Sequence, residues 1–445
     1  MGLNEGQLEA YENIKGFLDD EESLISAVTL VGPPGAGKSF LLGKILDGVE
    51  YIAAAPSWKA AAVLTESIGQ QVITVASLLG IKLNEKTGKF VADRNPDSQN
   101  ALKGVKLVVI DEVSMMSNDL IQLLFDKKAD NCKVIFSGDL SQLPFVGAKP
   151  GEVTKAFTEF PVFELTEVMR QKKGSNIGPL LDVIRGAING DNDLEIERES
   201  KNDLRFHEEP RDFLNEFIRD YKDNPKGTRI MTYNNENSAN PFSVKTLNDM
   251  ISNKLYGLKT DVYHKGSQLM SYGSFDVKNP KDHKKSLGRI FNSVDYTIVE
   301  VGRVRKSTKD IKAWIMDPRS GQSGEKTTPI TIEVQSLTLS CNIKQDEVFE
   351  VEVPTMTEAG YGKYHEIIKK AFTVSEFQFG YKLMEAFPNF RYAFAISCHK
   401  SQGSTYENAY VCTNNVMEQP SVSFIDKMKA IYVAASRPKN KLVIL

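Results

Sequence analysis

The residues best suited to chemistry stand in one short run near the N-terminus, Gly32-Pro33-Pro34-Gly35-Ala36-Gly37-Lys38-Ser39. Their spacing matches the phosphate-binding loop pattern G-x-x-x-x-G-K-[ST]. Glycines let backbone N–H groups turn toward phosphate oxygens, and the positive end of a following helix points at the same anion. An apolar stretch precedes the run and Phe40 follows it, which indicates a strand, a turn and a helix. A glycine-rich turn could match by chance, but this context favours nucleoside triphosphate binding.

Two acidic residues can supply the metal-binding and proton-accepting parts of such a site. In the pattern, Lys38 reaches the β- and γ-phosphates and the Ser39 hydroxyl binds Mg²⁺. Asp111 and Glu112 end the apolar run 107–110, and a buried strand would deliver Asp111 to the same ion. Glu112 could then take a proton from the attacking water. Paired acids are common on surfaces, but here they follow a phosphate loop at a suitable distance, which predicts nucleotide hydrolysis.

Three further polar residues follow predicted hydrophobic segments. Gln142 comes after the apolar run 133–137, where an amide can sense whether a γ-phosphate is present. Arg170 follows another hydrophobic segment, and Arg437 lies on what should be a short amphipathic helix. An arginine there can neutralise transition-state charge from across an interface. A loop Gln or Arg is ordinarily only solvated, so these roles depend on the surrounding motifs.

Two residues have interpretations that spacing alone leaves open. Gln7 lies three residues after Asn4 in a helix predicted over 4–22, which is the spacing of a capping box. Its amide could instead bond the adenine edge of a nucleotide. Trp58 follows the apolar run 51–55, where open α/β sheets form ligand crevices. Its ring could pack in the core or stack on a nucleobase.

The whole chain has the composition of a globular protein. Its length of 445 residues exceeds a single core and indicates about two to four domains. The net charge of −3 provides no global attraction to nucleic acid, so such binding would need a local groove. The cysteines are scattered, the N-terminus has no apolar signal core, and no apolar run could span a bilayer. We therefore expect a soluble, cytoplasmic protein without disulfides or a zinc site.

The second half of the chain is not uniform. Strand-like runs recur at 229–233, 392–396, 409–412 and 441–445. Between 258 and 385 apolar and polar residues alternate, which indicates an inserted β-rich domain. Within it, the basic segment 278–312 is either a solvated face or a surface that contacts phosphates. Earlier in the chain, a polar interval at 81–102 favours a small hairpin with a turn near Gly88 over a solvated loop.

The order of these stretches resembles the motifs of superfamily 1 helicases over nearly the whole chain. In chain order the matching positions are Gln7, 32–39, 56–59, 74–79, Asp111 with Glu112, 138–144, 165–171, 399–405 and 432–437. The starting residues 3–7 and the runs 111–115 and 399–403 are most similar to the RecD-like branch, superfamily 1B, and within it to the Dda helicases of T-even bacteriophages. Ala76, where the family often has His, and Ser436, where it usually has Thr, depart from the pattern.

The resemblance implies an α/β fold with two RecA-like P-loop domains on parallel sheets, a β-hairpin pin and an inserted β-rich, SH3-like domain. The implied boundaries are 1–80 and 103–172 for the ATP-binding domain 1A, 81–102 for the pin or domain 1B, 173–257 and 386–445 for domain 2A, and 258–385 for domain 2B. ATP would bind between domains 1A and 2A.

The resemblance also implies the roles of individual residues, with ATP and Mg²⁺ as cofactors. Catalysis would involve Lys38, Glu112, Gln142, Arg170 and Arg437, and the metal ligands would be Ser39 and Asp111. The implied nucleotide-binding residues are Gln7, Gly32, Pro33, Gly35, Ala36, Gly37, Lys38, Ser39, Phe40 and Gly403. The implied contacts to single-stranded DNA are Pro56, Ser57, Trp58, Lys59, Thr74, Ser77, Phe90, Ser397, His399, Lys400 and Gln402, with Phe90 as the wedge of the pin.

The implied activity is that of an ATP-dependent 5′→3′ DNA helicase that translocates on single-stranded DNA and unwinds duplexes in phage-type replication or recombination. Expected partners are single-stranded DNA and DNA forks, with a single-strand-binding protein and replication or recombination proteins as further candidates. We expect a monomer without membrane contact, in the host cytoplasm if the chain is of phage origin. Three alternatives stay open: a translocase that displaces bound proteins with little unwinding, a nucleotide-switched binding module and a small-molecule kinase.

Overall fold

The computed structural model describes residues 2–84, 89–93, 101–145, 147–149, 151–168, 174–191, 198–236, 240–257, 263–278, 286–316, 323–344, 346–374 and 376–445. Its contacts divide the chain into two compact units. Unit 1 comprises Met1–Phe217, Gly227–Val244 and Ile396–Leu445, and unit 2 comprises Ile218–Lys226 and Lys245–Ala395. Residues 386–395, which the sequence assigns to domain 2A, therefore lie in unit 2.

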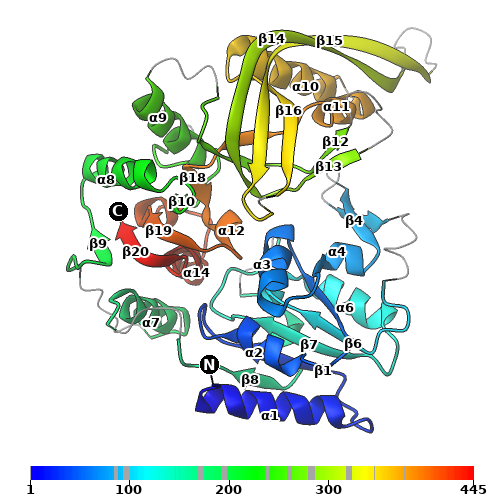
Figure 1. Ribbon diagram of the computed structural model, residues 1–445, viewed down its shortest axis with the longest axis vertical. Coiled ribbons are helices and arrows are strands. Elements are labelled where there is room, and N and C mark those ends of the chain that lie inside the picture. Colours follow the sequence, from blue (N-terminus) through cyan, green and yellow to red (C-terminus); the bar gives the residue numbers. More distant parts are fainter. Residues whose placement is uncertain are drawn as a thin grey trace. The chain divides into compact units, whose positions relative to one another are not determined.

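The first sheet of unit 1 has the strand order β3-β2-β6-β7-β1-β8, and its paired strands run parallel. The strands are β1 (Ala27–Val31), β2 (Ile52–Ala55), β3 (Ile73–Thr74), β6 (Leu107–Ile110), β7 (Lys133–Gly138) and β8 (Val162–Glu164). The accompanying helices, blue to cyan in Figure 1, are α1 (Glu5–Asp19), α2 (Lys38–Ile45), α3 (Trp58–Ile68), α4 (Val75–Leu78) and α6 (Asn118–Lys127).

Successive residues of a central strand enter two separate cores, one on each face of this sheet. In β1, Val28 and Leu30 pack into the core that includes residues of α1, α2 and α3. Ala27 and Val31 pack into the core that includes residues of α4 and α6. Alternation with a period of two is the geometry of a strand, and burial on both faces is why the strands are continuous apolar runs. The predicted α/β fold is confirmed for this half of unit 1.

The predicted hairpin is confirmed as β4 (Ile81–Asn84) and β5 (Lys89–Ala92), which pair antiparallel. The turn predicted near Gly88 lies outside the described residues. Ile81 is buried in the core beside α4 and α6, whereas Phe90 is 46% exposed. The hairpin therefore presents an aromatic ring to solvent from a base that the core anchors.

The second sheet of unit 1 has the order β18-β10-β19-β20-β9, and the pairs β10–β19, β19–β20 and β20–β9 are parallel. Its strands are β9 (Leu204–Phe206), β10 (Thr228–Thr232), β18 (Ala395–Ser397), β19 (Tyr406–Val411) and β20 (Pro438–Ile444). Its helices are α7 (Ile177–Ile188), α8 (Pro210–Asp223), α12 (Cys398–Ser401), α13 (Thr413–Met417) and α14 (Phe424–Ala435). Phe213 and Phe217 of α8 pack edge-on against Tyr410 of β19, with ring centroids 5.3 and 5.2 Å away. This is the second of the two predicted parallel sheets.

The apolar run 392–396, predicted as one strand, is divided between two sheets. β17 (Phe390–Tyr392) pairs with β11 (Gln268–Ser271) in unit 2, whereas β18 belongs to the second sheet of unit 1. Ala393 and Phe394, both buried, connect them. The prediction of a single strand is wrong because apolar character indicates burial and does not specify which sheet a strand joins.

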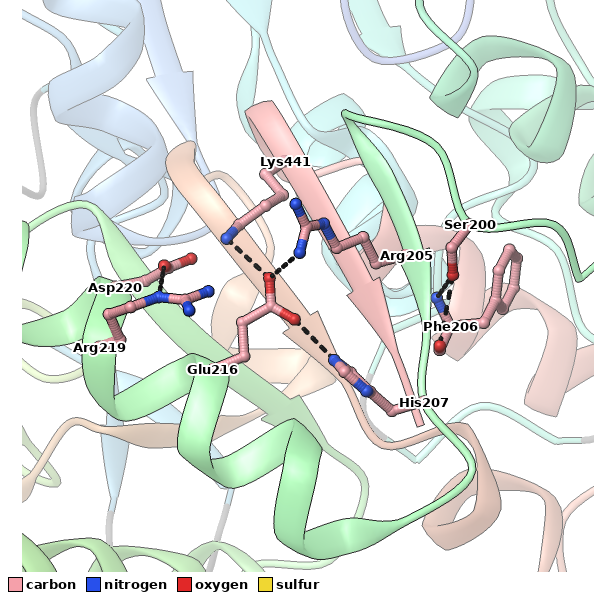
Figure 2. A network of polar contacts seen from close by, with 8 residues as sticks. All are labelled: Ser200, Arg205, Phe206, His207, Glu216, Arg219, Asp220 and Lys441. Carbon is pink, nitrogen blue, oxygen red and sulfur yellow. Dashed lines mark hydrogen bonds and ion pairs between the residues drawn. The ribbon is translucent and has the colours of Figure 1, made fainter.

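A buried carboxylate joins α8 to the edge of the second sheet (Figure 2). Glu216 is 6% exposed and lies 3.2 Å from Arg205, 3.1 Å from Lys441 and 2.6 Å from His207. Burial by itself raises the pKa of Glu216, but the bonds from His207 and Lys441 and the nearby positive charges outweigh burial and lower that pKa. The ionised carboxylate thus holds β9, α8 and β20 together.

Unit 2 is β-rich, as predicted. Its sheet has the order β16-β15-β14-β11-β17 and is built on the long antiparallel pair β14 (Asp295–Met316) and β15 (Ser323–Cys341), with β16 (Val348–Pro354). A separate hairpin is formed by β12 (Phe275–Lys278) and β13 (Ser286–Ile290), and α9 (Val244–Tyr256) precedes the strands. β16 and β17 are the edges of this sheet, so its closure into an SH3-like barrel stays a prediction.

Two helices cover part of the long β14–β15 pair (Figure 1). They are α10 (Lys363–Thr373) and α11 (Phe377–Met384), and their apolar side chains share a core with Ile311, Ile330 and Ile332. Part of the basic segment 278–312 packs within unit 2, because Lys309 Nζ lies 4.0 Å from the centre of the Phe387 ring.

Across the described part of the chain, no helix has the length and apolar character needed to cross a membrane.

Candidate active site

The phosphate-binding loop lies between the end of β1 at Val31 and the start of α2 at Lys38. Gly35 and Gly37 have φ angles of 88° and 86°, a left-handed conformation that residues with side chains rarely adopt. A Cβ at Gly37 would also lie 2.5 Å from Gln7 Nε2. The turn therefore requires glycine at 35 and 37 for its backbone angles, and at 37 also because the Gln7 side chain packs against it.

Gln7 has the capping role that its spacing predicts. Its backbone N–H donates to Asn4 Oδ1 at 2.8 Å, and its own Oε1 accepts from the Asn4 N–H at 3.2 Å. Its Nε2 donates to Ala36 O at 3.0 Å inside the phosphate-binding loop. The side chain thus anchors α1 to the loop, and the hydrogen bond to adenine stays a prediction.

A cavity of ≈ 330 Å³ opens beside this loop, and residues from both sheets of unit 1 line it. The predicted site residues in the lining are Gly35, Gly37, Lys38, Ser39, Phe40, Asp111, Glu112, Gln142, Gly403 and Arg437. Four predicted nucleotide-binding residues do not line the cavity: Gln7, Gly32, Pro33 and Ala36. The last three belong to the loop itself, and Gln7 donates a hydrogen bond to Ala36 O. Lys38 Nζ donates to Gly32 O at 2.7 Å and to Pro33 O at 3.2 Å. Its ammonium group therefore lies against the loop at one end of the cavity.

The two predicted acids occupy the carboxyl end of β6. Asp111 is held by its N–H, which donates to Ala54 O on β2 at 3.0 Å. Glu112 has φ of 53°, a left-handed angle that is unusual for a residue with a side chain and turns the chain sharply after the strand. Burial, and then the charge of Asp111, raise the pKa of Glu112, while Arg437 and Lys38 act in the opposite direction. Among the described residues Glu112 Oε2 has no hydrogen-bond partner, so its lone pairs are available to a bound molecule.

Arg437 reaches the same cavity from the second sheet. It lies two residues beyond the end of α14 at Ala435, not on the helix where the sequence placed it, and it is 3% exposed. Its guanidinium donates to Val433 O at 2.7 Å, Ser436 Oγ at 2.9 Å and Ser404 O at 3.3 Å. Burial lowers the pKa of Arg437, and Glu112 is the acid that most opposes this shift. The cation is thus held by its own segment and by Ser404 before any ligand arrives.

The remaining predicted catalytic residues have different outcomes. Gln142 is 3% exposed and lines the cavity, and its Oε1 has no hydrogen-bond partner within the described ranges. Arg170 lies in the segment 169–173, outside the described residues.

Sequence reasoning missed one buried acid beside the cavity. Asp139 follows β7 directly, is 4% exposed and accepts from the Ser141 N–H at 2.9 Å. Burial raises the pKa of Asp139, and Lys38 is the charge that most opposes this shift. The position of Asp139 could have identified it as a site residue. It follows a parallel strand that neighbours the strand before Asp111, and functional polar residues of such sheets gather at the carboxyl ends of the strands.

Three residues predicted to contact DNA are helix caps. Ser57 Oγ accepts from the Ala60 N–H at 3.2 Å, Thr74 Oγ1 from the Ser77 N–H at 3.1 Å and Ser397 Oγ from the Lys400 N–H at 3.3 Å. Each of these residues lies where a strand ends and a helix begins, and capping the helix is the ordinary role of Ser and Thr at that position. Thr74 Oγ1 and Ser77 Oγ also lie 2.9 Å apart, so both hydroxyls are engaged.

Two more residues predicted to contact DNA connect the two sheets of unit 1. Lys59 is 7% exposed and donates to Tyr406 Oη at 3.4 Å. Gln402 is 5% exposed and donates to Leu143 O at 3.3 Å. Gly403 has φ of 68° and packs against Ala60, which explains the glycine at that position. The Lys59 and Gln402 side chains hold elements of unit 1 together, and their contact with DNA stays a prediction.

The last group of predicted DNA-contacting residues lies nearer the surface. Trp58 and Lys400 are half-buried, as is Pro56 before the first turn of α3. His399 packs edge-on against Tyr233 with ring centroids 5.5 Å apart, and burial lowers the pKa of the imidazole. A neutral aromatic pair at the end of β18 is suited to contact with bases more than with phosphates.

Two family models match the chain. Residues 2–203 match the model described as an AAA domain, and residues 392–445 match the UvrD-like helicase C-terminal domain. The first match contains the phosphate-binding loop and both acids, and the second contains Gly403 and Arg437. The two matches therefore divide the cavity lining in the same way as the two sheets do.

Two relatives are similar in sequence. The ATP-dependent RecD2 DNA helicase of Deinococcus radiodurans is 29% identical over 188 residues, which cover 40% of this chain and 24% of that protein. An uncharacterized protein of Acanthamoeba polyphaga mimivirus is 23% identical over 484 residues, which cover 93% of this chain and 94% of that protein.

Solved structures of Pif1 helicases are similar in fold. The Pif1 helicase of Candida albicans is 16% identical, with a TM-score of 0.51 over 100% of this chain and 94% of that one. A Pif1 structure determined for unwinding at forked double-stranded DNA is 18% identical, with a TM-score of 0.50 over 100% of this chain and 92% of that one. The chain therefore has the α/β fold of Pif1 helicases, and part of its sequence is similar to a RecD-like helicase.

Proposed function

We propose that this protein is an ATP-dependent DNA helicase of the Pif1-like and RecD-like type, which moves 5′→3′ on single-stranded DNA. The composite lining of the cavity carries the proposal: Lys38 and Glu112 follow strands β1 and β6 of the first sheet, and Arg437 directly precedes β20 of the second. A site that two sheets complete can couple nucleotide turnover to a change in their arrangement, and that change can move a bound strand.

The residues of the cavity fit a nucleoside triphosphate with Mg²⁺. Gly35 and Gly37 shape a cradle of backbone N–H groups, and Lys38 adds a cation for the β- and γ-phosphates. Ser39 and Asp111 would hold the metal ion, which neutralises phosphate charge when bound. Among the described residues no group of three His, Cys, Asp or Glu side chains could hold a metal ion. Phosphate oxygens would therefore complete the coordination, as is usual for Mg²⁺.

Hydrolysis would use the acid Glu112 and the arginine Arg437, which line the same cavity. Glu112 accepts a proton from the attacking water, and its raised pKa makes it a better proton acceptor than an exposed carboxylate. Arg437 neutralises charge that develops on the γ-phosphate, and its place in the second sheet makes this step depend on closure. Gln142 is proposed to sense the γ-phosphate, and Arg170 to act as a second cation.

The DNA path is proposed from the resemblance and from exposure. Trp58, His399, Lys400 and Pro56 would contact the strand, while Phe90 would act as the wedge of the pin. Ser57, Thr74 and Ser397 would position these residues through their caps, and Ser77 through its bonds with Thr74. The predicted domain boundaries, the closer similarity to Dda helicases, monomeric action and a role in phage-type replication or recombination belong to the same proposal.

The deciding experiment compares two forked DNA duplexes, one with a 5′ tail and one with a 3′ tail, in an unwinding assay with ATP. Unwinding from the 5′ tail alone supports the proposal, and unwinding from the 3′ tail alone overturns the RecD-like polarity. Lys38→Ala is the inactive control. ATP hydrolysis that single-stranded DNA leaves unchanged would instead favour a nucleotide-switched binding module. DNA-stimulated hydrolysis without unwinding would favour a translocase that displaces proteins.

A further inference from the structure

Unit 2 contains a groove between β15 and α10, with a volume of ≈ 740 Å³. We call it the β15–α10 groove. Its floor is apolar, because Ile330, Ile367, Ala371 and Phe379 line it. Ile330, Ala371 and Phe379 belong to a core of unit 2, so packed side chains support the floor. No role in nucleotide binding or DNA contact falls on these residues.

One wall of the groove is an open strand edge. β15 pairs with β14 on one side, but on its other side β16 pairs only with the part from Val334 to Ser340. Within the described ranges, no strand pairs with this edge at Thr328–Thr331, which lines the groove. An open edge of this kind accepts an added strand from another chain.

The direction of the backbone groups at this edge can be read from its neighbour. Glu333 O accepts the Thr355 N–H at 3.0 Å on the β16 side of β15. Because strand backbone groups alternate, Thr331 and Pro329 direct their carbonyl groups to the same side. Pro329 has no N–H, which limits pairing with further copies of a flat strand while leaving acceptors in place. The edge can therefore take one short strand.

The other wall is cationic. Lys363 and Lys370 line the groove from α10, and both are exposed. They are two helical turns apart, about 10 Å along α10, which an extended chain covers in about three residues. Among the described residues that line the groove, Glu376 is the single acid. Two exposed cations over an apolar floor complement a ligand that carries both carboxylates and apolar side chains.

We propose that the β15–α10 groove binds an extended acidic peptide of a partner protein, which adds a strand to the open edge of β15. Alternate apolar side chains of the peptide pack on Ile330, Ile367 and Phe379, and its carboxylates approach Lys363 and Lys370. The apolar floor argues against nucleic acid, whose binding surfaces need cations along a continuous track. This interaction is independent of the proposed helicase activity.

The test measures fluorescence anisotropy of a labelled peptide of alternating Glu and Val residues, titrated with the full-length protein. Saturable binding is expected, and the variant with both Lys363→Glu and Lys370→Glu should bind at least about tenfold more weakly. Lys369→Glu is the matched control, because Lys369 is exposed on the same helix and does not line the groove. Unchanged ATP hydrolysis in both variants shows that each is folded.

Three results would overturn the proposal. The first is no saturable binding up to about 1 mM, the weak limit of a specific complex. The second is equal binding by the same peptide N-methylated at every residue, because such a peptide has no N–H group left to donate to the carbonyl groups of the strand edge. The third is displacement of the peptide by oligothymidylate, which would assign the groove to nucleic acid. Ile367→Glu, at a half-buried position on the groove floor, should also weaken binding without change in ATP hydrolysis.

Discussion

Lys59 Nζ donates a hydrogen bond to Tyr406 Oη at 3.4 Å, and this bond joins the two sheets of unit 1. The Tyr406 ring also lies 5.8 Å from Lys59 Nζ and 5.4 Å from the guanidinium carbon of Arg229. The backbone N–H of Tyr406 donates to Arg437 O at 3.1 Å. One tyrosine therefore connects the start of α3, next to Trp58, with the arginine that lines the nucleotide cavity.

We predict that Tyr406→Phe weakens the stimulation of ATP hydrolysis by single-stranded DNA about 2- to 10-fold, the worth of one hydrogen bond. The ring and its two cations remain, so hydrolysis without DNA should change little. The measurement is the ATPase rate with and without oligothymidylate, and Tyr11→Phe on α1 is the matched control. An equal loss in both rates would show that Tyr406 supports the fold only. Lys59→Met should give the same loss, and the double variant should add nothing further.

Glu112→Gln should lower the rate of ATP hydrolysis by a factor of about 10² or more, because a proton acceptor is lost while the shape is kept. Nucleotide binding, measured by the anisotropy of a fluorescent ATP analogue, should stay within a few-fold. Glu9→Gln on the exposed side of α1 is the control. A rate within a factor of two of the parent protein would remove Glu112 from the mechanism.

Gly37→Ala should weaken nucleotide binding strongly for two separable reasons. The φ angle of 86° costs an alanine about 1–2 kcal/mol, and the added Cβ meets Gln7 Nε2 at 2.5 Å. Gln7→Ala alone is the reference for the double variant, which should still bind nucleotide more weakly than Gln7→Ala, because the contact is relieved and the backbone strain remains. Gly43→Ala within α2 is the matched control and should bind nucleotide normally. Full recovery in the double variant would show that the left-handed backbone is not limiting.

Phe90→Ala should reduce the unwinding of a forked duplex several-fold and leave DNA-stimulated ATP hydrolysis nearly unchanged. The reason is that Phe90 is 46% exposed on the hairpin, so it can act on DNA without supporting the core. Val91→Ala, at the neighbouring position of β5, is the control, because Val91 lies on the opposite face of the strand. Parallel loss of unwinding and hydrolysis in Phe90→Ala would contradict its role as a wedge.

Glu216→Gln should destabilise unit 1 by about 2 kcal/mol at neutral pH, less than a fully buried ion pair because Arg205 and His207 are partly exposed. The pKa of Glu216 is lower in the folded protein than its usual value of 4.5, so the ionised group stabilises the fold above that value. This contribution should disappear as the pH falls through the folded pKa. Thermal unfolding at several pH values should therefore show the variant and the parent converging in acid. A constant difference would contradict this assignment, and Glu209→Gln is an exposed control on the same segment.

The sequence identified the elements whose physical requirements are local. Glycines at left-handed positions, the lysine that opens α2 and the acids after an apolar run are specified by types and spacing, and the structure brings Lys38, Glu112 and Arg437 to one cavity. Spacing could not tell whether a polar side chain faces solvent or another element. Lys59, Gln402 and Ser397 were therefore predicted as DNA contacts, although their polar atoms bond within the fold. Asp139 was missed because a single acid after a strand has many ordinary roles.

The short passage between β17 and β18 decides how this protein can be shortened. Phe390 and Tyr392 are buried in the sheet of unit 2, and Ile396 only four residues later is buried in that of unit 1. Excision of residues 258–385, as the sequence alone would suggest, would remove β11 and leave β17 with two apolar side chains and no partner strand. Such a truncated protein should aggregate through the unpaired edges of β17. Excision from Lys245 to Phe394 removes β11 and β17 together and keeps β18 whole, so a minimal ATPase should be designed on that cut.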